Sequence, residues 1–314
     1  MPSISNTAEI EAAARLLRAG RLVAFPTETV YGLGANALDP EAVARIYAVK
    51  GRPPTSPLIV HVASVEMARS LVTSWPDLAD CLAQRFWPGP LTLVLEKQPT
   101  IPSIVTAGLA TVGLRMPAHP MALALIKAAG VPLAAPSANR FTQLSPTTAD
   151  HVRRSLGSDV DLILDGGPCE VGIESTVLSL AGPQPVLLRP GGISRAEIEA
   201  LIGQVTTSGD VSAAAHPAPG MHPRHYSPRT RLLLVEDGKV PEQGKGIYLR
   251  HEHAPIRSNI TVVQMPATAA DYAASLYGML HQADADSYDW IAVDAPPETP
   301  DWEAIHDRLR RASD

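Results

Sequence analysis

Cysteine and aromatic residues are scarce in this sequence. Its 314 residues include two cysteines, Cys81 and Cys169, which are far apart in the chain. Two isolated cysteines exclude a disulfide framework and a cysteine-rich zinc cluster, and they fit a reducing compartment. Aromatic residues make up 4% of the chain. The predicted cores must therefore be built from alanine, valine, leucine and isoleucine.

The sequence also lacks a basic excess and a long apolar run. Its 26 Lys and Arg residues face 32 Asp and Glu residues, a net charge of −6, which argues against a protein that coats nucleic acid. No run approaches the roughly 18 apolar residues of a membrane span. The first residues, MPSISNTAEIEAAARLL, lack the basic and apolar segments of a signal peptide. We expect a cytoplasmic protein with no membrane partner.

Short apolar runs and amphipathic segments alternate over residues 1–202. We predict a first helix over 7–19, capped by Thr7 and ended by Gly20, and a helix over 40–50. Further helices are predicted near 65–72, 77–86, 120–129, 147–156 and 195–202. Strands are predicted at 22–25, 58–62, 91–95, 111–115, 133–135, 162–165, 176–180 and 186–189. Strands sometimes follow one another directly, so we expect an α/β domain with a mixed, twisted sheet.

The periodic pattern stops from 203 to 229, where the chain is small, polar and rich in proline. A segment of this kind is a linker or a functional loop. Residues 230–314 return to a βα pattern, with strands at 231–235, 246–249, 261–264 and 290–293 and helices near 268–283 and 301–312. We therefore predict three parts: a domain over 1–202, a linker over 203–229, and a small open α/β domain of Rossmann-like type over 230–314.

Polar residues cluster where the predicted strands of the first domain end. Phe25-Pro-Thr-Glu-Thr-Val-Tyr-Gly-Leu-Gly34 places hydroxyls and a carboxylate beside glycines that permit a turn close to a ligand. Its alternative interpretation is an ordinary strand-to-helix turn with threonine caps. Lys50-Gly-Arg52 pairs a point charge with a guanidinium fork, a combination that suits a triphosphate. The alternative is that both cations only complement the negative end of their helix.

Other strand ends repeat this theme. Arg115 precedes Met116-Pro117, and Arg189 precedes Pro190-Gly-Gly192. Pro136-Ser-Ala-Asn139, Asp165-Gly-Gly167 and Gly172-Ile-Glu-Ser-Thr176 also follow short apolar runs. His61 lies inside one such run, where a core histidine is the commoner interpretation. Six polar strand ends in one domain indicate a single concave polar site. The sequence has no Walker-type glycine loop, dinucleotide fingerprint or metal-binding histidine pair, so no resident metal site is predicted.

Three motifs together resemble the YrdC-type threonylcarbamoyl-AMP synthases. They are Pro26-Thr-Glu-Thr-Val-Tyr-Gly-Leu-Gly34, Lys50-x-Arg52 and Ser137-x-Asn139. The likeness covers about residues 1–202. The second half is similar to the smaller C-terminal domain of the long members, on its position, its length and the His225-Tyr-Ser-Pro228 element.

The resemblance implies a curved mixed sheet with a basic concave cavity that holds ATP beside L-threonine. It assigns five residues to L-threonine: Thr29, His61, Arg115, Ala135 and Ser175. It assigns eight to the nucleotide: Arg52, Ser56, Thr111, Ser137, Asn139, Ser145, Arg189 and Tyr226. Tyr226 would fold back over the nucleotide as a lid. Lys50 and Arg52 would neutralise the phosphates, together with a Mg²⁺ ion carried in by ATP.

The implied reaction joins three substrates. Bicarbonate or CO2 adds to the threonine amine, the carbamate oxygen attacks the α-phosphorus of ATP, and pyrophosphate leaves. The product would pass to a separate tRNA-modifying transferase. One rival is an RNA-binding module, which would explain a weak RNA contact, although the cations lack aromatic stacking neighbours. A second rival is a hydrogenase-maturation carbamoyltransferase, which two isolated cysteines disfavour.

Overall fold

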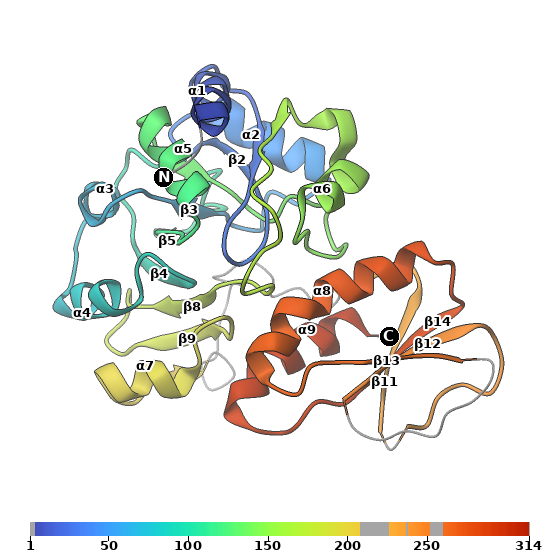
Figure 1. The fold of residues 1–314 in the computed structure, drawn as a ribbon. Helices are drawn as coiled ribbons and strands as arrows, with labels where there is room; N and C mark the ends of the chain where they lie inside the picture. The colour runs from blue at the N-terminus through green and yellow to red at the C-terminus, as the bar shows by residue number, and fades with distance from the viewer. Residues whose placement is uncertain (1–3, 208–225, 237, 252–259, 314) are drawn as a thin grey trace.

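The computed structural model describes residues 4–207, 226–236, 238–251 and 260–313. These residues form a ten-stranded sheet from the first part of the chain and a four-stranded sheet from the last part. Figure 1 shows the two sheets in neighbouring bodies, with helices α8 and α9 of the second body on its side nearest the first. Most of the predicted linker over 203–229, including His225, lies outside the described residues.

The first part contains all eight predicted strands and all seven predicted helices of residues 1–202. Its helices are α1 (Ile4–Arg18), α2 (Pro40–Lys50), α3 (Val65–Ser70), α4 (Asp77–Phe86), α5 (Pro120–Ala129), α6 (Ala149–Leu156) and α7 (Arg195–Ile202). Its strands are β1 (Val23–Phe25), β2 (Gly32–Asn36), β3 (Ile59–His61), β4 (Leu91–Glu96), β5 (Thr111–Arg115), β6 (Leu133–Ala134), β7 (Leu162–Ile163), β8 (Thr176–Ser179), β9 (Val186–Arg189) and β10 (Thr206–Thr207). A single 3₁₀ turn, η1 (Gly157–Asp159), follows α6.

The sheet mixes parallel and antiparallel neighbours, as predicted. Its strand order is β10-β9-β8-β4-β5-β3-β6-β2-β1-β7. The pairs β5–β3 and β4–β8 are parallel, whereas β4–β5 and β3–β6 are antiparallel. This order brings β3, β5 and β6 side by side although they are far apart in the chain. The ends of these strands carry residues of the predicted site.

Two local predictions for the first part were wrong. Gly32 and Gly34 do not form a turn, because both lie in β2, which pairs antiparallel with β1. A Cβ on Gly34 would lie 2.8 Å from the Phe25 ring, and one on Gly32 would lie 3.3 Å from it. The glycines therefore make room for this aromatic ring. Thr7 is not a helix cap, because α1 already begins at Ile4.

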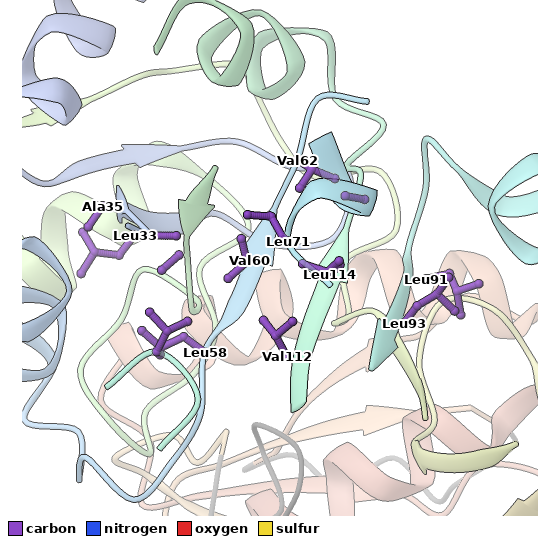
Figure 2. Close-up of a cluster of buried hydrophobic side chains, with 14 of the residues drawn as sticks. Leu33, Ala35, Leu58, Val60, Val62, Leu71, Leu91, Leu93, Val112 and Leu114 are labelled. Carbon is purple, nitrogen blue, oxygen red and sulfur yellow. The ribbon is translucent and has the colours of Figure 1, made fainter. Parts of the chain in front are cut away.

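The main core is aliphatic, as the shortage of aromatic residues predicts. Figure 2 shows leucine and valine side chains from β2, β3, β4 and β5 gathered in one cluster, among them Leu33, Val60, Leu93 and Leu114. All four are fully buried. Burial of such a side chain contributes about 1.5–3 kcal/mol. The strand ends are thus held in place by a packed layer behind them.

The second part confirms its predicted strands and helices. Its strands are β11 (Arg231–Val235), β12 (Gly246–Arg250), β13 (Ile260–Gln264) and β14 (Trp290–Asp294), and its helices are α8 (Ala269–Ala285), the 3₁₀ turn η3 (Pro300–Trp302) and α9 (Glu303–Ala312). The strand order is β11-β14-β12-β13, and every neighbouring pair is parallel.

One face of this second sheet packs on α8 and α9. Leu249 and Ile291 share a core cluster with Leu276 of α8 and Leu309 of α9. That cluster also includes Ile173 from the first part, so the two parts share an apolar contact.

No helix in the described part of the chain combines the length and the apolarity that crossing a bilayer demands.

Candidate active site

A polar pocket lies at the strand ends of the first sheet. Its walls are formed by Thr27, Thr29, Val30, Gly32, Arg52, Ile59, His61, Arg115, Ala135, Pro136, Ser137, Glu174, Ser175, Arg189 and Tyr226. The cavity at its centre encloses about 50 Å³. Most of these residues come from the first part of the chain, and Tyr226 is the first described residue after Thr207.

The five residues assigned to L-threonine all line this pocket. Strand pairing brings three of them together. His61 ends β3 and stands opposite Arg115 of β5 on one side and Leu133 of β6 on the other. Ala135 follows β6 directly and donates its backbone N–H to Ile59. Thr29 lies in the segment after β1, where its hydroxyl is 2.9 Å from that of Thr27.

Arg115 is buried beside Glu28, a residue that was not among the predicted site residues. Arg115 Nη2 lies 2.8 Å from Glu28 Oε1. Both of these atoms are buried and neither has a hydrogen-bond partner of acceptable geometry. The Arg115 Nε donates to the Gly89 carbonyl, and Glu28 Oε2 accepts from the Ala118 backbone N–H. Glu28 therefore pairs with the guanidinium and holds it in place beside the pocket.

His61 is a neutral imidazole at physiological pH. Burial, and then the charge of Arg115, lower its pKa to about 3. Its Nδ1 is a second buried polar atom of the pocket without a hydrogen-bond partner. The ring also packs edge-on against Phe25, with the centroids 6.0 Å apart. Backbone groups of Ile59 and Leu133 also act on the ring and favour its protonated form, so His61 is a core histidine that at the same time lines the pocket.

Four of the eight residues assigned to the nucleotide line the pocket: Arg52, Ser137, Arg189 and Tyr226. Arg52 is held by Ser56, whose hydroxyl accepts from Nη2 at 2.5 Å, and by the Pro57 carbonyl at 3.0 Å. Burial is the main reason that the pKa of Arg52 falls to about 10. Arg189 donates from Nε and Nη2 to the Ser175 carbonyl, at 3.2 and 2.8 Å.

Lys50 stands behind the pocket wall. Its Nζ donates to the carbonyls of Ser137, at 2.6 Å, and Asn139, at 2.5 Å. Burial, and then the charges of Arg52 and Arg140, hold its pKa well below the ordinary lysine value. The lysine and the Ser137-x-Asn139 motif thus form one unit, with Lys50 as the support of that turn. Asn139 itself braces the loop by donating Nδ2 to the Arg140 and Gln143 carbonyls.

Thr111 and Ser145 lie outside the pocket lining. Thr111 is at the opposite end of β5 from Arg115, about 13 Å away at the usual strand rise. It lines a separate small cavity with Thr92 and Thr106. The structure does not bring this residue to the pocket. Ser145 is fully buried and donates its hydroxyl to Glu174 Oε1 at 2.6 Å, so it reaches the pocket through that carboxylate.

Glu174 and Arg308 are polar groups that sequence reasoning did not assign. Glu174 lines the pocket and accepts from Arg308 Nε at 2.6 Å and from Tyr277. Burial alone would raise the pKa of Glu174, but Arg308 and then Arg189 outweigh it and the pKa is lowered. Glu174 lies in the quoted Gly172–Thr176 motif, which was a usable signal. Arg308 carries no local signal, because α9 is 134 residues away in the chain.

Tyr226 covers one side of the pocket. It is fully buried, and its backbone has φ of +63°, a left-handed conformation that is strained for a bulky residue. The Arg308 guanidinium lies 5.2 Å from the centroid of its ring. The next residue, Ser227, donates its backbone N–H to the Thr142 carbonyl. The chain at Tyr226 and Ser227 is therefore packed against the loop that follows Asn139.

Two family models together span the chain. One, described as "Telomere recombination", matches residues 15–191, and the other, described as "Threonylcarbamoyl-AMP synthase, C-terminal domain", matches residues 193–314. Among the described residues, no group of three or more His, Cys, Asp or Glu side chains could hold a metal ion.

Known relatives agree with both matches. A threonylcarbamoyl-AMP synthase of Pyrococcus abyssi is 43% identical over 321 residues, which cover 97% of this chain and 94% of that relative. The crystal structure of P. abyssi Sua5 complexed with L-threonine superposes with a TM-score of 0.90 at 41% identity, over 98% of this chain and 94% of that one. A shorter synthase of Halorhodospira halophila is 40% identical over 49% of this chain and 81% of its own length. The chain therefore belongs to the threonylcarbamoyl-AMP synthase family, in its long form with the C-terminal domain.

Proposed function

We propose that this enzyme is an L-threonylcarbamoyladenylate synthase, a nucleotidyltransferase that makes threonylcarbamoyl-AMP and pyrophosphate from ATP, L-threonine and bicarbonate. One observation carries the proposal. Arg115, which is ion-paired to Glu28, and His61, whose buried Nδ1 makes no hydrogen bond of standard geometry, line one pocket with Arg52 and Arg189. Three buried arginines against a single pocket favour an anionic ligand, because buried charge is costly unless it is paired.

In this proposal the Arg115 side of the pocket holds L-threonine. A guanidinium matches a carboxylate in geometry, and Arg115 is already oriented by Glu28. The neutral His61 adds a hydrogen-bonding nitrogen without adding charge. Thr29 and Ser175 supply hydroxyls, and Ala135 supplies a small side chain at the same wall. A solved relative that binds L-threonine supports a threonine site in this chain.

The nucleotide would occupy the side lined by Arg52, Ser137 and Arg189. Both arginines can neutralise phosphate oxygens in a buried setting, where charge interactions are strong. Lys50, Ser56, Asn139 and Ser145 would act one layer behind, through the side chains and carbonyls that they hold. The position of Thr111 gives no support to a nucleotide role. Magnesium would enter as part of the ATP substrate and neutralise its phosphates.

The chemistry requires placement more than proton transfer. The threonine amine and bicarbonate form a carbamate and release water. A carbamate oxygen then bonds to the α-phosphorus of ATP as the bond to the departing pyrophosphate breaks. The protein would bind both substrates, orient the carbamate and exclude water, which hydrolyses carbamates and mixed anhydrides.

The linker would act as a lid. A cavity of about 50 Å³ is too small for ATP, because sites for ligands of that size enclose about 300–1,000 Å³. The pocket must therefore widen before ATP can enter, and in this proposal Tyr226 is the lining residue that moves. We propose the division into a catalytic domain over 1–202, a lid over 203–229 and a C-terminal domain over 230–314. We also propose a cytoplasmic location, with the product passed to a separate tRNA-modifying transferase.

The test is pyrophosphate release from ATP, with L-threonine and bicarbonate each omitted in turn. We expect release to require both and to fail with L-alanine in place of L-threonine. Release that does not depend on threonine would point to another acceptor. No release under any condition, combined with RNA binding that weakens steeply with salt, would favour the binding-module alternative.

A further inference from the structure

A carboxylate forms part of a pocket whose other charged lining residues, in the described part of the chain, are arginines. Glu174 lines the pocket next to Ser175, whose carbonyl accepts from Arg189. If the pocket binds ATP, an uncompensated Glu174 would repel the phosphates, since charge interactions are weakly screened in buried sites. Some group must therefore cancel this charge.

Arg308 is that group, and it comes from the last helix of the chain. Its side chain is 1% exposed. Nε donates to Glu174 Oε2 at 2.6 Å, Nη1 donates to Asp307 Oδ2 at 2.5 Å, and Nη2 donates to the Pro190 carbonyl at 3.0 Å. Each guanidinium nitrogen is thus used, and two of the three partners belong to the first part of the chain.

The same guanidinium also lies against the lid residue. Its central carbon is 5.2 Å from the ring centroid of Tyr226, within the range of a cation–π contact. The Tyr226 ring packs in addition against Tyr277 of α8, with the centroids 6.0 Å apart. Tyr277 donates its hydroxyl to Glu174. Helices α8 and α9 therefore contact both the charged wall of the pocket and its cover.

We propose that Arg308 is a positioning residue of the active site, which cancels the charge of Glu174 toward ATP and holds Tyr226 over the pocket. This inference rests on the proposed function only in naming ATP as the anion. It gives the C-terminal part a role in substrate binding, although none of the described residues of 230–314 lines the pocket.

Two substitutions and their combination, made in the full-length chain, test this charge relation, with the Kd for ATP measured by calorimetry in the presence of magnesium. Arg308→Met leaves Glu174 charged and should weaken ATP binding roughly tenfold. Glu174→Gln removes the repulsive charge and should tighten binding about threefold or more. The double variant carries neither charge and should lie close to the wild type. A group with only a structural role would not produce changes of opposite sign.

Arg311→Met is the matched control. Arg311 is on the same helix and also bonds to Asp307, at 2.9 Å, but it is not among the partners of Glu174. We expect its Kd for ATP to stay within twofold of the wild type. Melting temperatures of all variants identify any that fail to fold. If Arg308→Met fails to fold, the tightening expected for Glu174→Gln decides the question.

The proposal is overturned if Glu174→Gln binds ATP more weakly than the wild type, or if the double variant is as weak as Arg308→Met. The proposed function fails in a different way. A wild-type chain that binds ATP, yet releases no pyrophosphate with L-threonine and bicarbonate, would contradict the synthase reaction while the order of the ATP affinities still tests Arg308.

Discussion

The two parts of this protein use buried cations in opposite ways. In the first part, Lys50 and Arg52 donate to backbone carbonyls and a serine hydroxyl, which are neutral acceptors. Burial lowers the pKa of both. In the second part, Arg308 donates to two carboxylates. Burial lowers the pKa of Arg308, but Tyr226, Glu174 and Asp307 outweigh it and raise the pKa well above its ordinary value.

This contrast distinguishes buried cations whose charge is available to a ligand from buried cations whose charge is already matched by carboxylates of the protein. A buried arginine held by neutral groups keeps its charge for an incoming anion, at a cost in desolvation. A buried arginine held by carboxylates has its charge already matched. Arg115 lies between these cases, because it pairs with the Glu28 carboxylate and also donates to the neutral Gly89 carbonyl. The same residue type therefore has a ligand-binding or a positioning role according to its acceptors.

Removing the second part should reduce the activity more than any other change proposed here. A chain ended after residue 202 loses Tyr226 and Arg308, so Glu174 keeps no arginine partner from α9 and the pocket loses its cover. We expect the fragment to fold, as the shorter Halorhodospira halophila relative suggests. Its kcat/KM for ATP should fall at least about a hundredfold, because water exclusion and charge matching are lost together. Circular dichroism checks the fold and pyrophosphate release checks the activity. Full kcat and KM in the fragment would contradict the lid.

The substitution Arg115→Lys tests whether this arginine of the first part binds the carboxylate of L-threonine. A lysine keeps the charge beside Glu28 but cannot bind a carboxylate with two parallel hydrogen bonds. We expect the KM for L-threonine to rise roughly tenfold or more, and the KM for ATP to change much less. Steady-state pyrophosphate release with each substrate varied gives both constants. Equal rises in the two constants would show that Arg115 does not bind threonine alone.

Acidification should weaken the contact between the two parts, with a smaller effect than the truncation or the Arg115 substitution. His151 of α6 and His281 of α8 are stacked with ring centroids 3.8 Å apart. Burial, and then His281, lower the pKa of His151 to about 4, and burial also lowers the pKa of His281. Asp150 and Asp284 favour protonation, whereas Arg154 opposes it. Because the folded pKa values lie below the unfolded value, the stabilisation is complete above about pH 6.5 and is lost as the pH falls toward 4.

Melting temperatures at pH 7.5 and pH 5 measure this effect. We expect the double variant His151→Gln/His281→Gln to lose about 2–5 °C less than the wild type on acidification. His306→Gln is the control, because His306 lies on α9 and bonds to the Pro297 carbonyl away from the stacked pair. An unchanged pH response in the double variant would show that the stacked pair does not carry the acid sensitivity.

The sequence predicted the elements of this fold well, since periodicity and turn residues report local preferences. Strand β9 was predicted at its observed bounds, and α5 begins at Pro120 and ends before Gly130, as its pattern indicates. Strand β2 was missed because Gly32 and Gly34 favour a turn on local grounds. The Phe25 ring of the paired strand reverses that preference. A cross-strand contact of this kind leaves no local trace.

The candidate site likewise has features that the sequence predicts and features that only the tertiary structure determines. The sequence by itself determined that polar residues end several strands, and the family motifs named most of the residues that line the pocket. Only the tertiary structure decided which of them meet. It placed Thr111 at the far end of β5, set Lys50 behind Ser137, and brought Arg308 to Glu174 from 134 residues away. The physical reason is that strand order and helix packing, which depend on the whole core, set distances between residues that the chain keeps far apart.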